Sequence, residues 1–209
     1  MISGAIAADI LAFWFRDGSG AALDYRAGRK RWFRKSLAFD QQVRERFADL
    51  YRVTYAQASA DSSFHHRVAP RAGDLSGAQR SLALTLLFDQ LPRNMFRSCP
   101  AAFAADPQAR AVARAAIAAG VDQALPPLQR LFFYFPLEHS ESRQDQRQSV
   151  ALFKAIATQH PEFQDTYDYA LRHQRVIERF GRYPHRNPIL GRRSTAAEVR
   201  FLKQPGSSF

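Results

Sequence analysis

Apolar residues recur along the chain at intervals of three and four positions, the spacing of one buried helix face. The first such segment begins at Ser3, a residue type that caps helices, and carries Ile6, Ile10, Phe13 and Trp14 on one face. No stretch shows the two-residue alternation of a half-buried strand, so the pattern predicts an all-α fold. Later segments place inward Val43, Phe47, Leu50, Tyr51 and Thr54; Leu82, Ala83, Leu86 and Leu87; Val112, Ala113, Ala116 and Ile117; Leu128, Leu131, Phe132 and Phe135; Val150, Phe153, Ile156 and Ala157; and Ala170, His173, Ile177 and Phe180.

Capping residues and prolines predict where these helices begin and end. Asp40 is placed to cap the second long helix, and Asp106 to cap a later, alanine-rich one. Pro92 and Pro136 are expected to end the helices that precede them, because proline disfavours a helical conformation in the residue before it. The remaining predicted boundaries are Gly120 and Gly181 as helix ends, and two capping boxes, Ser142 with Asp145 and Thr195 with Glu198.

Two stretches lack a sustained helical period and are predicted to be non-helical. Residues 16–28 are rich in turn formers, and residues 59–74 form the longest predicted loop. His65 and His66 lie in that loop, where exposed histidines are favoured over metal ligands. The other segments predict seven to nine helices, stacked as hairpins into a short curved array.

Length and composition favour one soluble domain. With 209 residues, 46% hydrophobic, the chain can bury a sizeable core, and we expect a single domain over residues 1–203 with a flexible tail at 204–209. No apolar run approaches the ~18 residues that a membrane-spanning helix needs. The amino terminus lacks a basic region and a cleavage signal, so a cytoplasmic protein is expected. The single cysteine, Cys99, excludes an internal disulfide and a cysteine-based zinc site.

A formal charge of +11 raises the question of a nucleic-acid partner, because clustered cations bind phosphates. Residues 29–35 are the densest basic run and surround Trp32 and Phe33, a mixture also found on single-strand binders. We favour the alternative that both aromatic residues are core anchors and the charges are solvated. Nucleic acid is therefore not an expected partner. A membrane is not expected either, because no apolar run can span a bilayer, and the oligomeric state is left open.

The stretch 179–195 is too specific in composition to be a mere connection. It holds five arginines and one histidine, with two glycines and two prolines that fix the path of the backbone. We expect this loop to present Arg182, His185, Arg186 and Asn187 to a cleft.

Two further polar blocks stand at predicted helix ends. Asp89 falls in the last turn of its helix, where the helix dipole disfavours a carboxylate, so an arginine is expected beside it. Candidates are the neighbouring Arg93 and the arginines of the 179–195 loop. The second block, residues 138–142, directly follows the most hydrophobic predicted helix.

Several motifs in the chain carry a family resemblance. They are ILAFWF, WFRKSLAFD, LALTLLFDQLPRNMFR, FFYFPLEHSES, DQRQSV, FGRYPHRNPILGRRST and EVRFL. Together they resemble the bacterial DUF924 family over nearly the whole chain. The resemblance implies an all-helical, TPR-like fold with no established biochemical function. It also implies a set of motif positions, which are Asp89, Gln90, Arg93, Asn94, His139, Ser140, Glu141, His173, Arg179, Arg182, His185, Arg186, Asn187 and Arg192.

Our preferred interpretation is a site for an anionic small molecule or acidic peptide. Guanidinium groups match carboxylates and phosphates with paired hydrogen bonds, and Arg93, Arg182 and Arg186 are expected to form the pocket with help from His139 and His185. The polar blocks lie far apart in the sequence and next to helix ends, and converging polar groups in an apolar scaffold are typical of binding sites.

Two alternatives stay open. His139 or His185 could act with Glu141 or Asp89 as an acid–base pair in a hydrolase or lyase, although no motif fixes a reaction class and enzyme activity is left undecided. The polar groups could instead form a purely structural network, with Asp89 bonded to Arg182 and Glu141 to Arg186. No cofactor or metal is predicted, because metal-ligand spacing is absent and the arginines would repel a cation.

Overall fold

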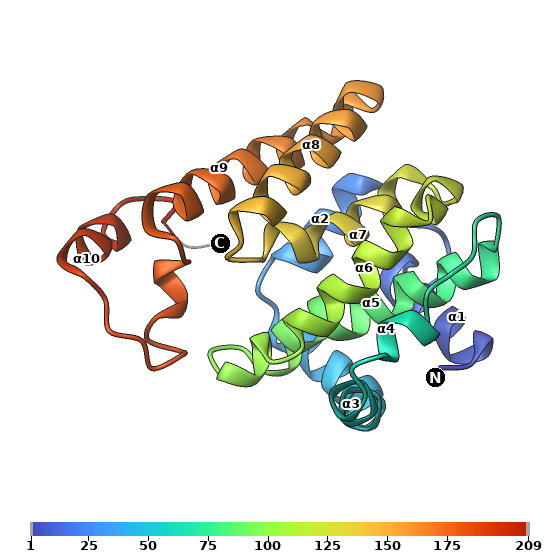
Figure 1. Cartoon of the computed structure of the whole chain (residues 1–209). Coiled ribbons are helices and arrows are strands. Elements are labelled where there is room, and N and C mark those ends of the chain that lie inside the picture. Colours follow the sequence, from blue (N-terminus) through green and yellow to red (C-terminus); the bar gives the residue numbers. More distant parts are fainter. Residues whose placement is uncertain (1, 208–209) are drawn as a thin grey trace. The chain divides into compact units, whose positions relative to one another are not determined.

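The computed structural model describes residues 2–207, and within this range the chain is all-α, as predicted. It has ten α-helices and four 3₁₀ helices, with one isolated β-bridge and no β-strand among the described residues (Figure 1). The helices are α1 (Gly4–Phe15), α2 (Tyr25–Phe33), α3 (Leu37–Ala60), α4 (Phe64–Arg67), α5 (Leu75–Met95), α6 (Asp106–Ala118), α7 (Pro127–Glu138), α8 (Arg143–Gln159), α9 (Gln164–Phe180) and α10 (Ala196–Leu202), with 3₁₀ turns at Pro100–Phe103, Val121–Ala124, Pro161–Phe163 and Pro184–Arg186. The count exceeds seven to nine, since α4 and the start of α2 lie in stretches predicted to be non-helical. A TPR-like stacking stays a prediction.

Backbone contacts divide the chain into two compact units. The first comprises residues up to 97 together with 101–136, and the second comprises 98–100 together with the residues from 137 onwards. Each unit is described on its own below. The expected single domain over residues 1–203 stays a prediction.

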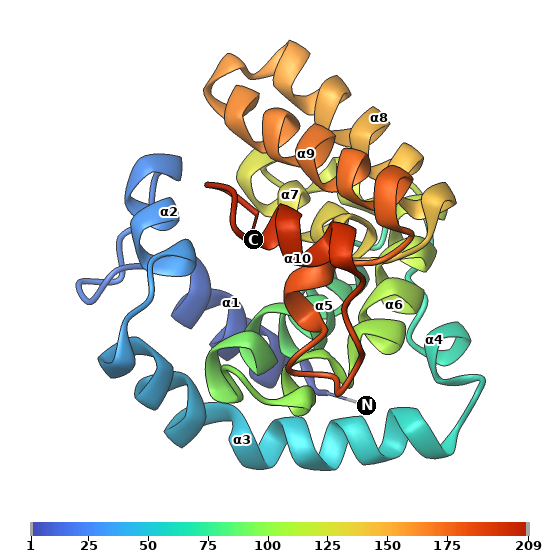
Figure 2. The same cartoon turned by 90° about the vertical axis from the view of Figure 1, so that its left-hand side faces the viewer.

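Helix α5 forms the core of the first unit and packs against α1, α3 and α6. The predicted stripe, Leu82, Ala83, Leu86 and Leu87, is completely buried. Burial extends round the whole helix from Ser81 to Pro92, so this helix is more central than an amphipathic pattern indicates. Helix α3, at the lower edge of Figure 2, covers another part of this unit.

Two predicted helix ends at prolines are wrong. Helix α5 continues through Pro92 to Met95, and α7 continues through Pro136 to Glu138. A proline within a helix removes one backbone hydrogen bond, and the buried residues Leu91, Asn94 and Met95 stabilise the extra turn of α5 by packing.

Helix α2 caps the carboxyl end of α1, a role that the sequence did not reveal. Arg31 donates to the carbonyls of Phe13 and Arg16, both at 2.9 Å, and Trp32 Nε1 donates to the carbonyl of Trp14 at 2.9 Å. Trp32 is buried, as predicted. Its neighbour in the sequence, Phe33, is 49% exposed, so the prediction of two core anchors is half wrong. Ile6 is likewise exposed, because α1 turns Ala7 and Phe15 inward instead.

Asp40 does not cap α3. The helix begins three residues earlier, and Ser36 Oγ accepts the capping hydrogen bond from Phe39 N at 3.3 Å. The Asp40 carboxylate is instead buried and bonded to Asn94 at 2.8 Å and to Arg97 at 2.8 Å through its Nη2. A cap and a buried ion pair use the same residue type, which the local sequence cannot tell apart. Asp106 similarly lies within its helix, with Ala105 at the cap position.

The second unit is built on α8 and α9, which lie side by side in Figure 1. The 3₁₀ turn at Pro161–Phe163 leads into α9, and Gly181 ends it with a positive φ of 70°, which favours glycine. Thr195 and Glu198 form the predicted capping box of α10. Of the predicted tail, residues 204–207 are described, and Ser207 Oγ donates to the carbonyl of Leu202 at 3.1 Å. Residues 208–209 lie outside the described range. None of the described helices is long and apolar enough to span a membrane.

Candidate functional site

The loop that follows α9 is held in one shape by two glycines and a short 3₁₀ turn. Gly181 and Gly191 both have positive φ, at 70° and 65°, where side chains are disfavoured. Between them, Tyr183 is extended and the turn Pro184–Arg186 reverses the chain. The prediction that this stretch bends at fixed places is confirmed for these positions.

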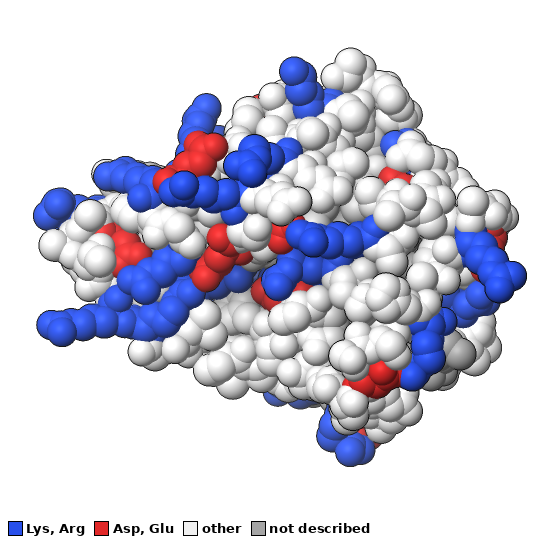
Figure 3. Space-filling view, viewed as in Figure 1, with Lys and Arg blue, Asp and Glu red and all other residues white. Residues whose placement is uncertain are grey.

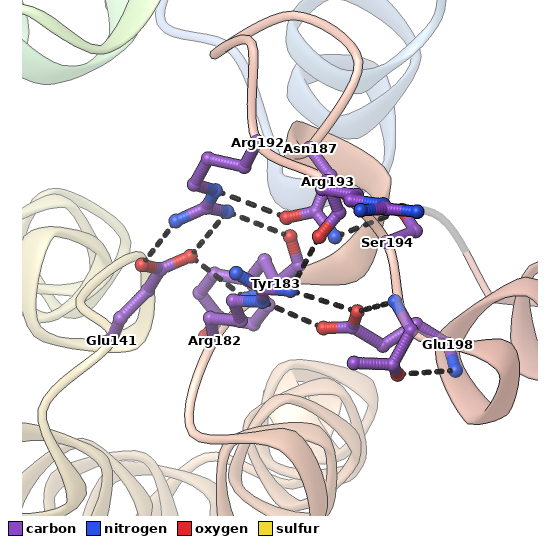
Figure 4. Close-up of polar contacts among 9 residues, drawn as sticks. Glu141, Arg182, Tyr183, Asn187, Arg192, Arg193, Ser194 and Glu198 are labelled. Carbon is purple, nitrogen blue, oxygen red and sulfur yellow. Dashed lines mark hydrogen bonds and ion pairs between the residues drawn. The ribbon is translucent and has the colours of Figure 1, made fainter.

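Arg192 locks the loop to the segment between α7 and α8. Its guanidinium donates to both oxygens of Glu141, at 2.7 and 3.0 Å, and also to the carbonyl of Tyr183 at 3.1 Å (Figure 4). Burial alone would raise the pKa of Glu141, but hydrogen bonds from Arg192 and from the Tyr183 N–H outweigh it and lower the pKa. Within this unit Arg192 donates two hydrogen bonds to Glu141, and the pairing of Glu141 with Arg186 considered from the sequence stays a prediction.

Arg182 makes an equally specific pair with the first turn of α10. Its Nε and Nη2 donate to the two oxygens of Glu198 at 2.7 and 2.9 Å, and Nη2 also donates to the carbonyl of Arg193 at 2.9 Å (Figure 4). Hydrogen bonds from Arg182 lower the pKa of Glu198 to about 2. Arg182 thus fastens the loop to α10, and the pairing with Asp89 that the structural alternative proposed stays a prediction.

Asn187 completes this part of the loop. It is fully buried, accepts a hydrogen bond from Arg192 Nε at 3.0 Å, and donates to Ser194 Oγ at 3.0 Å. Three of the predicted site residues, Arg182, Asn187 and Arg192, therefore form a structural network, as one of the sequence-based alternatives expected.

Tyr183 and Gln146 are central residues that sequence reasoning missed. Gln146 Nε2 lies 2.6 Å from the carbonyl of Glu138, 2.7 Å from that of Ser140, and 2.8 Å from the Tyr183 hydroxyl. The Tyr183 hydroxyl donates to the same Glu138 carbonyl. Burial raises the pKa of Tyr183 well above its ordinary range. Both residues stand inside quoted motifs, DQRQSV and FGRYPHRN, which was the available signal.

Cationic and imidazole groups surround the Tyr183 ring. The ring centre lies 5.5 Å from that of His173 and 5.6 Å from that of His185, and the guanidinium carbon of Arg186 lies 4.6 Å from it. His139 is next in line, with its ring centre 6.5 Å from that of His173. We call His139, His173, His185, Arg186 and Tyr183 the histidine cluster. The sequence predicted its three histidines and its arginine as site residues.

The histidines of this cluster that have shifted pKa values are neutral at pH 7. Burial lowers the pKa of His173 to about 3, and burial together with the charge of Arg186 lowers that of His185 to about 4. His173, which is 4% exposed, points inward as predicted. Its Nδ1 lies 2.9 Å from the carbonyl of Tyr169 and 3.3 Å from Glu138 Oε1, a buried carboxylate absent from the predicted set.

The remaining predicted residues of the second unit have local roles. Ser140 Oγ donates to Asp145 at 2.6 Å, and Ser142 Oγ accepts from the Asp145 N–H at 3.5 Å, which is one of the two hydrogen bonds of the predicted capping box. Arg179 is exposed and lies over the rings of Phe180 and Phe201, with its guanidinium carbon 4.8 and 5.9 Å from their centres. On the face drawn in Figure 3, Lys and Arg side chains gather over α9 and α10.

The block from Asp89 to Asn94 belongs to the first unit. Asp89, in the last turns of its helix, has an arginine partner there, as predicted. Arg93 Nη1 lies 3.3 Å from Asp89 Oδ1, and the same guanidinium donates to both oxygens of Asp106 at 3.0 and 3.2 Å. Gln90 donates to Asp89 at 2.7 Å, and Asn94 binds Asp40. The prediction of a buried pair is confirmed with Arg93. A contribution of Arg93 to a pocket with Arg182 and Arg186 stays a prediction.

No group of three His, Cys, Asp or Glu side chains in residues 2–207 is arranged to hold a metal ion. A guanidinium supplies positive charge and paired hydrogen bonds, and neutral imidazoles supply one donor and one acceptor each.

Comparisons with known proteins identify relatives without a known function. The model of the DUF924 family, described as a bacterial protein of unknown function, matches residues 10–206. A solved structure of a protein of unknown function from Agrobacterium tumefaciens is 37% identical, with a TM-score of 0.74, and the match covers 97% of this chain and 99% of that one. The chain matches no curated protein sequence.

Proposed function

The chain belongs to the DUF924 family of bacterial proteins of unknown function, and we propose that it binds the anionic group of a small molecule or acidic peptide at the histidine cluster. Arg186 is the charged anchor, and the half-buried His139 and His185 contribute hydrogen bonds. His173 is a positioning residue, because the Tyr169 carbonyl and Glu138 fix its ring. Arg192 and Asn187 support the loop from which Arg186 projects.

The observation that carries this proposal is the packing of Arg186 against the Tyr183 ring within the histidine cluster. Arg182 and Arg192 each grip a carboxylate with two nitrogens, a geometry that stabilises the loop. The guanidinium carbon of Arg186 lies 4.6 Å from the centre of the Tyr183 ring, two imidazole rings lie against the same tyrosine, and only 7% of Arg186 is exposed. A buried guanidinium stacked on an aromatic ring is preorganised to hold a planar carboxylate or a phosphate.

Charge supports the same choice of ligand. Residues 137–207 contain twelve Lys or Arg residues and eight Asp or Glu residues, so the second unit has a positive net charge. Two of its acids, Glu141 and Glu198, are held in arginine pairs. An anion approaching this unit is therefore attracted over a longer range than the cluster itself provides.

A thermal-shift screen tests the proposal. Inorganic phosphate, acetate, citrate and a short glutamate-rich peptide are added to the wild type, to Arg186→Gln, and to Arg175→Gln, an exposed arginine of α9 that serves as the charge-matched control. A ligand at about 100 times its Kd stabilises by about 2.7 kcal/mol, a Tm rise of roughly 5–10 °C for a chain of this size. We expect the rise in the wild type and the control and its loss in Arg186→Gln. A wild type that no anion shifts, or an equal shift in Arg186→Gln, would remove the proposal.

An acid–base enzyme, a hydrolase or lyase, is the second candidate. It is favoured by one contact, that between His173 and the buried Glu138, because a carboxylate beside an imidazole can orient a general base. Glu141 fits this role less well than expected from the sequence, since both of its oxygens accept hydrogen bonds from Arg192. Turnover of an ester or hydroxy-acid panel that is lost in both His185→Gln and Glu138→Gln would favour the enzyme.

A further inference from the structure

Residues 25–39 of the first unit contain six cations and no acid. The cations are Arg26, Arg29, Lys30, Arg31, Arg34 and Lys35, in a stretch that covers α2 and the start of α3. Arg31 is engaged in capping α1 and stacks on Phe13 and Phe39. Lys30, Arg34 and Lys35, by contrast, are exposed.

Two large apolar side chains are exposed at the two ends of the turn between α2 and α3. Phe33, the last residue of α2, is 49% exposed, and Leu37, the first residue of α3, is 77% exposed. Arg34 and Lys35 lie between them in the sequence. Exposed apolar residues occur singly on many proteins, but two of them next to a run of cations indicate an interaction surface.

Contacts with buried residues hold this turn in place. The Phe33 ring meets Trp32 and Phe135 edge-on, with ring centres 6.2 and 5.7 Å apart. Trp32 is itself buried and bonded to the Trp14 carbonyl, and Ser36 caps α3. The exposed side chains are therefore presented by a fixed backbone, which lowers the conformational cost of binding.

We propose that the turn 33–37 docks on the surface of an anionic phospholipid bilayer. Phe33 and Leu37 would enter the boundary between headgroups and acyl chains, while Lys30, Arg34 and Lys35 bind lipid phosphates. The phosphates of a single-stranded nucleic acid would bind the cations, and a base could stack on Phe33. Such a ligand has no apolar group to contact Leu37, the more exposed of the two. The bilayer accounts for both apolar residues.

The inference corrects an expectation from the sequence. No membrane partner was expected, because no apolar run is long enough to span a bilayer, and Phe33 was placed in the core; its exposure leaves an apolar side chain next to the cations. Docking on the surface requires no membrane-spanning helix, and the described residues contain none. The surface belongs to the first unit and is independent of the proposed anion site at Arg186.

Vesicle flotation tests the inference. Full-length protein is mixed with vesicles of phosphatidylcholine alone, or of phosphatidylcholine and phosphatidylglycerol in equal parts. We expect it to float only with the mixed vesicles and to be released by high salt, since screening weakens surface charges. Arg34→Glu/Lys35→Glu should weaken binding by at least about tenfold, because each basic residue near an anionic surface contributes about fivefold. Phe33→Ser/Leu37→Ser should weaken it on the same vesicles.

Matched variants separate docking from general charge. Arg147→Glu/Lys154→Glu makes the same charge change on exposed residues of α8, and Val53→Ser removes an exposed apolar residue of α3. Both should bind the mixed vesicles like the wild type. The proposal is overturned if the wild type does not bind mixed vesicles, or if the matched variants lose as much binding as the variants of the turn 33–37. It is also overturned if the protein binds a single-stranded oligonucleotide but not the vesicles.

Discussion

Arg192 and Glu141 face each other with two hydrogen bonds of 2.7 and 3.0 Å, and this pair ties the loop after α9 to the segment that precedes α8. The same arginine also binds the Tyr183 carbonyl and the Asn187 side chain. One guanidinium thus fixes the backbone on both sides of the turn that carries His185 and Arg186. The geometry of the histidine cluster depends on it.

Arg192→Ala should therefore loosen this loop and lower the free energy of unfolding. Both partners are partly exposed, at 24% and 29%, so we expect a loss of about 1–2 kcal/mol, less than for a fully buried pair. Urea unfolding followed by circular dichroism measures it. Arg200→Ala, an exposed residue of α10, should change stability by less than about 0.5 kcal/mol. Equal effects of the two substitutions would contradict a structural role for Arg192.

Asp89→Ala should be more damaging. Asp89 is 1% exposed and takes hydrogen bonds or ion contacts from Gln90 and Arg93, so its removal leaves buried donors without their acceptor. We expect a loss on the order of 3 kcal/mol, measured by thermal and urea unfolding. The control is Asp49→Ala, at an exposed site of α3, which should be neutral. An unchanged melting curve for Asp89→Ala would count against the buried pair.

Acid should destabilise the protein through His173. Its pKa is about 3 in the folded protein and about 6.5 when unfolded, so below pH 6.5 the unfolded chain takes up a proton that the folded protein excludes. Stability is complete above pH 6.5 and falls with pH by up to about 1.4 kcal/mol per pH unit. His173→Gln should reduce this slope between pH 6.5 and 4.5, above the range where Glu141 and Glu198 titrate, and leave the part due to His185, whose pKa is lowered to about 4. A slope unaffected by the substitution would show that other groups cause it.

Helical periodicity was enough to predict the class of fold and the residues of the central helix. It failed where a tertiary contact replaces a local rule. Phe33 directly follows the buried Trp32, yet at the end of α2 it is exposed. Asp40 accepts hydrogen bonds from the distant Arg97 instead of capping its own helix. Pro92 lies inside α5 because packing outweighs one lost hydrogen bond.

The candidate site was predictable as a set of residues but not as a set of partners. Composition singled out the 179–195 loop, and the family motifs added His139, Glu141 and His173. Which arginine binds which carboxylate depends on how the loop lies against the segment before α8 and against α10. The sequence does not contain this information in a readable form. In the sequence Arg182, Arg186 and Arg192 cannot be told apart. In the structure Arg182 pairs with Glu198, Arg192 pairs with Glu141, and Arg186 lies over the Tyr183 ring.

Histidine-selective NMR tests the central claim, anion binding at Arg186, most directly. The chain has six histidines, and His65, His66 and His160, which lie outside the cluster, serve as internal controls. On titration with phosphate, or with whichever anion stabilises the wild type, we predict that the imidazole signals of His139, His173 and His185 move together and saturate. The controls should stay in place, and Arg186→Gln should abolish the movement while leaving the spectrum folded. Signals that do not move, or that move equally for all six histidines, would contradict the account.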